Sequence, residues 1–320
     1  MYAMREEDNK TKDTMKKQLC LIACMVVGMS LSAQVKNYIT LWGDLGEASL
    51  LSDISNVQNG ASLGVGGGIG AGYELYANRF LLDVGVGINV SHSAFSLNPH
   101  ASALPDQTDS EGDRFNYIFT LNDRQDAYTN TSLQIPLLLG AQLNRFYFLV
   151  GVKLDASLLV NTRVSTVISS EGEYPMFIDP FTGMPEHMFF NDYVLEQKGK
   201  VDFKTNVMAS AEIGWRLGHI DNSTGFDVPK PKTLYRIGLF ADYGIFDVHY
   251  RSNKPAVVLP ETFNAENMTS DMAVNDILST SQAQKIVNNL LVGVKFTVLF
   301  QLPEPKKCVF CNDDYTYLYR

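Results

Sequence analysis

One hairpin between residues 132 and 160 constrains the fold of this 320-residue chain more than any other segment. Apolar side chains occupy every odd position from Leu133 to Leu143, and then every even position from Phe146 to Val160. Period two on both sides of the turn Asn144-Arg145 predicts a β-hairpin with one apolar face. The opposite face carries polar residues: Gln134, Gln142, Lys153, Asp155 and Asn161. An apolar outside with a polar inside is typical of membrane β-barrels.

Six further segments show the same alternation, at 38–45, 62–76, 80–90, 203–217, 235–245 and 290–300. With the hairpin they predict an all-β fold, an eight-stranded antiparallel up-and-down transmembrane β-barrel with long extracellular loops and short periplasmic turns. The long loops are expected at about 93–127, 165–200 and 249–285, the last with a short helix near 272–278. An even number of strands predicts that both termini are periplasmic.

Charged residues are absent from the outward positions of these predicted strands, where one Lys or Arg at the bilayer midplane would cost about 2 to 4 kcal/mol. The inward positions carry six acids and six bases: Asp44, Glu74, Asp83, Asp155, Glu212, Asp242, Lys153, Arg163, Lys204, Arg216, Arg236 and Lys295. Eight strands enclose a space that side chains just fill. We therefore predict a lumenal charge network instead of an open conduit.

Two residue types predict local features of the barrel. Five inward glycines between Gly64 and Gly72 would leave room for a bulky neighbour such as Trp42 to cross the lumen. Pro136 has no N–H to donate to a closed sheet, so an irregularity is expected there.

The amino terminus has the organisation of a secretory signal peptide. Lys16 and Lys17 precede an apolar run from Leu19 to Leu31, and Leu31-Ser32-Ala33 provides small residues for cleavage before Gln34. An alternative interpretation is a lipoprotein signal with acylation of Cys24. The predicted organisation is an extension and signal at 1–33, the barrel at 34–302 and a periplasmic tail at 303–320. A net charge of −9 on an exported chain argues against nucleic-acid binding.

Two motifs in the hairpin carry a resemblance to a known family. Leu133-Gln134-Ile135-Pro136-Leu137-Leu138-Leu139 and the following Phe148-Leu149-Val150-Gly151-Val152 resemble the outer-membrane β-barrel domain family of Bacteroidota, which includes PorT-like proteins. A signal ending in Ser32-Ala33-Gln34 and a last strand ending in Phe300 are similar to that group as well. The resemblance implies an outer-membrane location and, for PorT-like members, a part in protein secretion. The tail beyond Pro303 departs from the pattern.

Other motifs give weaker indications of chemistry. The stretch Gly66 to Ala71 matches G-x-G-x-x-A, but a strand pattern continues through it and no helix follows to bind a pyrophosphate. Cys308 and Cys311 in the tail favour a disulfide or inert thiols, with a redox or partner-docking role as the alternative.

The five histidines form no metal-binding motif. His92 is expected to point outward at the end of its strand, as a hydrolase of the membrane would require, whereas Ser91 and Ser93 are expected to point inward. The acidic residues of the first long loop, Asp106, Asp109, Glu111 and Asp113, offer the alternative of bridging divalent cations to lipopolysaccharide.

These observations favour a non-enzymatic outer-membrane barrel that needs no cofactor or metal. Its expected surroundings are outer-membrane lipid and lipopolysaccharide, and its expected partners are other envelope or secretion proteins, bound through the loops or the tail. Two alternatives remain: a barrel that transports small solutes or hydrophobic compounds, and a membrane-embedded lipid hydrolase with His92 as its catalytic residue.

Overall fold

A computed structural model describes residues 35–303, except 53, 55–56, 58–60, 110–111, 185–186, 188, 218–232, 259–271 and 281–285. The predicted signal region at 1–33 and the tail with Cys308 and Cys311 lie outside the described residues. Among the residues that the structure describes, no helix has the length and apolar character needed to cross a bilayer.

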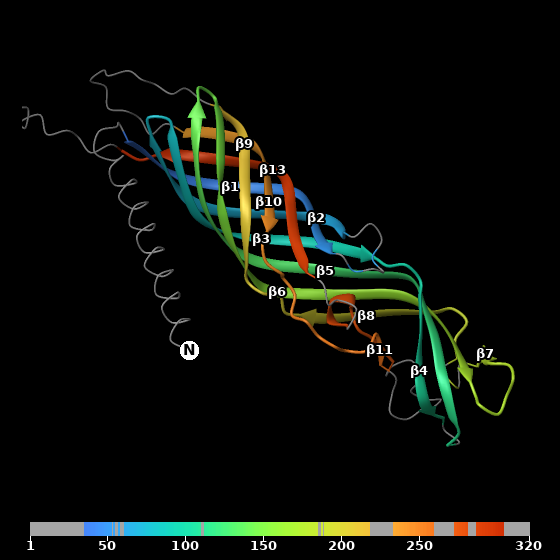
Figure 1. The fold of residues 1–320 in the computed structure, drawn as a ribbon. Helices are drawn as coiled ribbons and strands as arrows, with labels where there is room; N and C mark the ends of the chain where they lie inside the picture. Colours follow the sequence, from blue (N-terminus) through green and yellow to red (C-terminus); the bar gives the residue numbers. More distant parts are fainter. Residues whose placement is uncertain are drawn as a thin grey trace, which may run out of the picture.

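Eight antiparallel strands close into a ring (Figure 1). The closure is made by β1, which pairs with β2 on one side and with β13 on the other. The strands of the ring are β1 (Val35–Ser52), β2 (Leu63–Ala77), β3 (Phe80–Ser96), β5 (Arg114–Leu143), β6 (Phe146–Glu173), β9 (Asn206–Leu217), β10 (Thr233–Gly244) and β13 (Val287–Gln301). The predicted up-and-down barrel of eight strands is confirmed.

The strands are staggered, as closure of a barrel requires. The stagger can be followed by going around the ring from each residue to the one directly opposite it on the next strand. This path starts at Val150 on β6 and returns to β6 at Asn161, eleven residues further along the strand. One of these eleven residues is the extra residue of a bulge. The path runs through Ala211, Ala241, Val292, Glu47, Val65, His92 and Thr129. A stagger of this size tilts the strands by roughly 40° and leaves an interior that side chains fill.

The two ends of the barrel differ. At one end, here called the turn end, Asn78-Arg79 joins β2 to β3 and Asn144-Arg145 joins β5 to β6. Asn78 and Asn144 have φ of 62° and 58°, in the left-handed region that asparagine tolerates. The first residue of β1 and the last of β13 also lie at this end. The opposite end, here called the loop end, carries the connections from β1 to β2, β3 to β5, β6 to β9 and β10 to β13, whereas residues 218–232 join β9 to β10 at the turn end.

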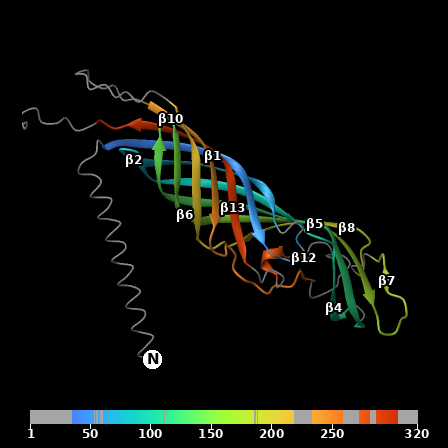
Figure 2. The same cartoon turned by 45° about the horizontal axis from the view of Figure 1, so that its top comes forward.

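The predicted loops at 93–127 and 165–200 are wrong for most of their length, because these residues form strands. β5 has 30 residues and β6 has 28, and 30 residues of strand span roughly 100 Å. Past the rim of the barrel, β4 (His100–Thr108) pairs with β5, while β7 (Phe181–Thr182) and β8 (Tyr193–Val201) pair with β6. We call this sheet, residues 100–130 and 159–201, the extension (Figures 1 and 2).

Two register shifts mark the passage from barrel to extension. Leu158 is an extra residue in β6, between the pairs Thr131/Leu159 and Ser132/Ser157. A second extra residue in β5 falls at Asp123-Arg124, where Asp123 has φ of 45°. A bulge moves the following side chains to the other face of a strand. Val160 and Asn161 were predicted outward and inward respectively, but Val160 is buried and Asn161 is exposed.

The connection between β10 and β13, here called the third connection, folds back onto the loop end of the barrel. It contains the short strands β11 (Val257–Val258) and β12 (Ala273–Val274), which pair with each other. The helix predicted near 272–278 is confined to one 3-10 turn, η3 (Ile277–Ser279), because Ala273 and Val274 are in β12.

Pro136 lies inside the ring without a bulge. Its register with Lys153 on β6 is unbroken. On the β3 side, pairing stops after Val84/Leu137 and resumes at Gly87/Gln134 without a change of register. The expected irregularity is therefore a local interruption of one ladder, as a residue without an N–H produces.

Candidate functional site

The outward faces of the eight strands form a continuous apolar belt of exposed Leu, Ile and Val side chains. Aromatic residues lie at both margins, with Phe80, Phe146, Trp215, Tyr235 and Phe300 at the turn end and Tyr243, Phe246 and Tyr250 toward the loop end. On β6 the belt extends from Phe146 to Leu158, which corresponds to roughly 30 Å along the barrel axis at a 40° tilt. These are the dimensions and margins of a membrane-spanning barrel.

Glu47 is an exception to the predicted absence of outward charge. β1 continues past its predicted end at residue 45, and Glu47 is exposed on the outer face, opposite Val65 and Val292. It lies two residues beyond the exposed Leu45 in the direction of the loop end of β1. The outward belt positions of the described strands hold no Lys or Arg.

The lumen next to the turn end is filled by a network of buried charges. Arg236 is fully buried and donates to Glu74 at 2.5 Å and to Asp83 at 2.7 Å. Arg216 also pairs with Glu74 and lies against the rings of Tyr38 and Tyr76, 5.4 Å from each ring centroid. Two guanidinium groups thus neutralise two carboxylates.

Two lysines continue the network deeper into the barrel. Lys295 pairs with Glu212 at 2.8 Å, and the Tyr147 hydroxyl donates to the same carboxylate at 2.7 Å. Lys153 pairs with Asp242 at 2.5 Å. These buried ion pairs fill this part of the lumen and block the path through the barrel.

Trp42 occupies the space that inward glycines were expected to leave, over the inner faces of β2 and β3. A Cβ atom on Gly70 or Gly85 would collide with its indole ring, and the Lys295 ammonium lies 5.3 Å from the ring centroid. The inward glycines of β2 and β3 therefore make room for the ring.

The structure brings together ten of the twelve residues predicted for the network. Asp44 lies opposite Lys295 in the β1/β13 ladder, and Asp155 accepts hydrogen bonds from Ser132 at 2.6 Å and Gln134 at 3.3 Å. Arg163 and Lys204 were assigned wrongly. Arg163 follows the Leu158 bulge and faces outward, paired with Glu196 at 2.6 Å. Lys204 precedes the first residue of β9 and lies 3.8 Å from Asp247 at the loop end.

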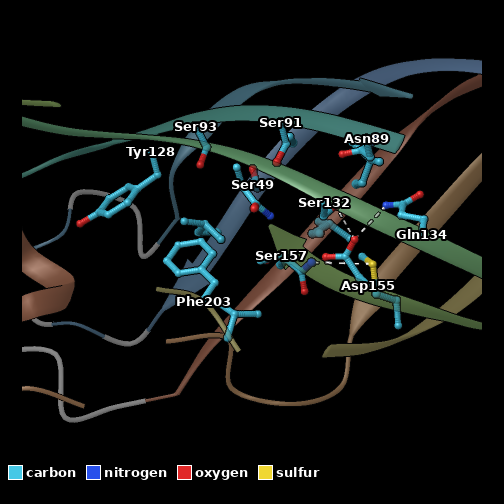
Figure 3. Close-up of a pocket in the computed structure, with 18 residues that line it drawn as sticks. Ser49, Asn89, Ser91, Ser93, Tyr128, Ser132, Gln134, Asp155, Ser157 and Phe203 are labelled. Atoms are coloured by element: carbon cyan, nitrogen blue, oxygen red, sulfur yellow. Dashed lines mark hydrogen bonds between the residues drawn. The ribbon is translucent and has the colours of Figure 1, made fainter. Parts of the chain in front are cut away.

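Beyond the charges, the lumen holds a cavity of about 40 Å³. Ser91, Ser93, Ser132, Gln134 and Asp155 project into it (Figure 3). A volume of this size admits roughly three water molecules. It is too small for a solute molecule of ordinary size.

Apolar residues close the loop end above this cavity. Ile277 and Leu278 of η3 are buried against Phe95, Tyr128 and Val248 in one hydrophobic cluster, which we call the plug. Asp126 holds the plug in place because its carboxylate accepts the Ile277 N–H at 2.5 Å and pairs with Arg124 at 2.7 Å. Burial raises the pKa of Asp126, although the contact with Arg124 opposes this shift. The described residues therefore close the lumen at both ends.

The extension has an aromatic core of its own. Phe115, Tyr117 and Phe119 of β5 pack with Phe189 and Phe190, and the Phe115 and Phe189 ring centroids are 5.6 Å apart. Burial raises the pKa of Tyr117 to about 12. Val257 of β11 and Met272, the residue before β12, pack on the same cluster and connect it to the third connection.

The connection between β6 and β7 presents apolar side chains to solvent. Met176 is 78% exposed, Phe177 56% and Ile178 101%. The base of this loop is rigid, since Tyr174 stacks on Phe115 at 5.1 Å and Phe181 packs edge-on against both Tyr174 and Phe177. We call residues 176–178 the tip. Sequence reasoning missed it, although three apolar residues between Pro175 and Pro180 in a polar stretch are a visible signal.

His92 and the serines lie as predicted from strand parity. His92 is exposed, and its Nδ1 is 3.0 Å from the Thr129 hydroxyl oxygen. Ser91 and Ser93 face the cavity on the other side of β3 (Figure 3). Four acids in the connection between β3 and β5 were candidates for binding divalent cations. Glu111 lies outside the described residues. Among the residues that the structure describes, no three or more His, Cys, Asp or Glu side chains gather in a group that could hold a metal ion.

The closed ring, the apolar belt with aromatic margins and the filled polar lumen define a transmembrane antiparallel β-barrel. A scan against protein-family models finds no match for this sequence, and a search of curated proteins finds none.

Solved structures of outer-membrane proteins match over most of their length at low similarity. The attachment invasion locus protein Ail of Yersinia pestis has 6% identity and a TM-score of 0.22, with 82% of this chain and 98% of Ail covered. The toluene transporter TodX of P. putida has 7% identity and a TM-score of 0.14, with 87% and 92% covered. OpdQ of Pseudomonas aeruginosa has 8% identity and a TM-score of 0.10, with 84% and 98% covered. The strand pairing of this chain itself defines the barrel.

Proposed function

We propose that this protein is a non-enzymatic barrel of the outer membrane that binds other envelope or surface components through its extension. The observation that carries the proposal is the tip, an exposed apolar group at the end of a sheet with its own aromatic core. Apolar and aromatic side chains that a rigid base holds in solvent are a common feature of protein interaction sites. Under this proposal the loop end is extracellular and both termini are periplasmic.

The closed lumen supports an interaction role over transport. A solute would have to displace the plug at one end and the Arg236 and Lys295 ion pairs at the other. A buried charge that is left without its partner costs about 3 to 5 kcal/mol. Transport of small solutes or hydrophobic compounds is therefore the less favoured proposal, and hydrolysis at His92 has no further support.

A finer proposal is an accessory role in protein secretion, like that of PorT-like proteins. It rests on the resemblance of residues 133–139 and 148–152 and on the expected periplasmic tail. Outer-membrane lipid and lipopolysaccharide would then surround the belt.

The experiment is affinity purification of the tagged protein from its native outer membrane in mild detergent, followed by mass spectrometry. It compares the unmodified chain with a tip variant, Met176→Ser/Phe177→Ser/Ile178→Ser. Val194→Ser is the matched control, since Val194 is an exposed apolar residue on the outer face of β8. We expect the tip variant to lose defined partners that the control retains.

A chain that lacks residues 303–320 tests the tail separately. Loss of envelope partners in that variant alone would assign the interaction to the tail. If the tip variant keeps every partner of the unmodified chain, the proposed role of the extension is wrong.

A further inference from the structure

A second surface lies on the outer side of the molecule, where the extension leaves the barrel. It is a groove of about 540 Å³, lined by side chains from β3, β5, β6 and β8. Its lining residues are His92, Ala127, Thr129, Asn161, Thr162, Arg163, Lys198, Gly199 and Lys200. This volume falls in the range of small-molecule sites, roughly 300 to 1,000 Å³.

The groove is basic although the chain as a whole carries a net charge of −9. Arg163, Lys198 and Lys200 all point outward; Glu196 is paired with Arg163, and the exposed Asp202 follows Lys200 by two residues. Within the described part of the chain, no salt bridge joins Lys198 or Lys200 to an acid. The Arg163–Glu196 pair is 2.6 Å long and its side chains are 55% and 54% exposed. An exposed pair of this kind contributes about 0 to 1 kcal/mol, so Arg163 can exchange its partner for an anionic ligand.

The groove borders directly on the apolar belt. On β3, Val90 lies two residues before His92 on the same face, and on β6, Leu159 lies two residues before Asn161. Arg163 is four residues beyond Leu159, which is roughly 10 Å along the barrel axis at 3.3 Å per residue and a 40° tilt. The basic side chains therefore lie at the depth of lipid headgroups if the belt lies in the hydrocarbon.

Strand pairing brings the polar groups of the groove into one row. Lys200 is opposite Asn161, Asn161 is opposite Thr129, and Thr129 is opposite His92. Arg163 is opposite Lys198 in the next row outward. A guanidinium fork and two ammonium groups suit the oxygens of a phosphate, and the neutral Asn and Thr groups suit hydroxyls.

We infer that this groove binds the phosphorylated headgroup of an anionic lipid in the surrounding leaflet, with the acyl chains along Val90, Leu158 and Leu159. The inference rests on the membrane placement in the proposed function. Continuity between the basic groove and the apolar belt favours a lipid over a soluble phosphate compound, because an amphiphile uses both surfaces at once.

The test uses the full chain in neutral detergent micelles, with phosphorylated lipid A and its dephosphorylated form as probes. Native mass spectrometry counts bound lipid for the unmodified chain and for the groove variant Arg163→Gln/Lys198→Gln/Lys200→Gln. The control, Arg114→Gln/Arg251→Gln/Lys254→Gln, removes three exposed bases outside the groove and changes the net charge equally. We expect the groove variant to bind phosphorylated lipid at least about tenfold more weakly, the control to bind normally, and the dephosphorylated lipid to bind weakly to all three.

The outcomes separate this inference from the proposed function. Equal binding of phosphorylated lipid by the groove variant and the unmodified chain would overturn the inference, as would competition by inorganic phosphate alone at comparable concentration. If the protein fails to insert into lipid vesicles, as measured by flotation, the membrane placement itself is wrong. Insertion with unaltered lipid binding in the groove variant would refute the lipid site alone.

Discussion

The same two strands, β5 and β6, run through both the barrel and the extension. Their inward faces are polar in the barrel and apolar in the extension. In the barrel, between residues 132 and 157, their inward faces carry Gln134, Lys153 and Asp155 and their outward faces carry Leu and Val. In the extension, their inward faces carry Phe115 and Ile168 among other apolar residues, and their outward faces are mainly polar. The extra residues at Leu158 and Asp123-Arg124 reset the alternation. One pair of strands thus serves two environments because bulges re-aim its side chains.

The two regions also differ in what stabilises them. The lumen depends on a few directional ion pairs in which each charge has a defined partner. The extension depends on many dispersive contacts among aromatic rings. Removal of one charge leaves its partner buried and unpaired, whereas removal of one ring leaves a cavity.

The largest effect is expected from Arg236→Ala, which leaves Glu74 and Asp83 without their shared guanidinium. The free energy of unfolding should fall by about 3 to 5 kcal/mol. Urea unfolding of the protein in micelles, monitored by tryptophan fluorescence, measures this loss. Arg163→Ala is the control, since an exposed pair contributes no more than about 1 kcal/mol. Equal losses in the two variants would show that the lumenal network does not stabilise the barrel.

Phe189→Ala should destabilise the extension by about 3 kcal/mol through the cavity it leaves between Phe115 and Tyr117. Because the ring of eight strands closes without the extension, the urea midpoint of the barrel should stay unchanged. Hydrogen exchange of the β4 and β8 amides should accelerate instead. A barrel midpoint that falls as far as in Arg236→Ala would contradict the separation of the two regions.

Ile277→Ala should loosen the plug by about 2 kcal/mol, seen as faster hydrogen exchange around η3. The conductance of the protein in a planar bilayer should stay at baseline, because the charge network still closes the turn end. Steady open-channel currents from the unmodified protein would refute the closed lumen.

The smallest effect on stability is expected from a change of pH that protonates the carboxylate of Asp247 at the loop end. Burial alone would raise the pKa of Asp247, but the Val287 N–H and His249 outweigh it and lower the pKa. Such a carboxylate stabilises the fold above its unfolded pKa, and this contribution is lost as pH falls through the folded pKa. The Val287 amide should exchange faster, relative to the intrinsic rate, at a pH below the lowered pKa of Asp247 than at pH 7. Asp247→Asn should abolish that difference, and an unchanged pH dependence in the variant would contradict the assignment.

The sequence predicted the barrel well because alternation is a local property. Outward Leu137 and Val150 and inward Glu74 and Arg236 follow from strand parity alone, without knowledge of which strands pair. Parity also placed His92 on the outside and Ser93 on the inside, and the row of glycines on β2 predicted the space for Trp42. The tip lies in the printed sequence as Met176-Phe177-Ile178, but its exposure depends on the aromatic base beneath it.

Tertiary structure decided which face each side chain takes beyond a bulge, because the alternation in the sequence does not reveal the extra residue. Arg163 left the predicted network because the extra residue at Leu158 turned it outward, and the strands of the extension were mistaken for loops because their alternation restarts at Asp123. The plug and the groove unite residues of β3, β5, β6, β8 and the third connection, which are far apart in the chain. A bulge is a change of one residue in register between two strands, so only their pairing determines which face each side chain takes.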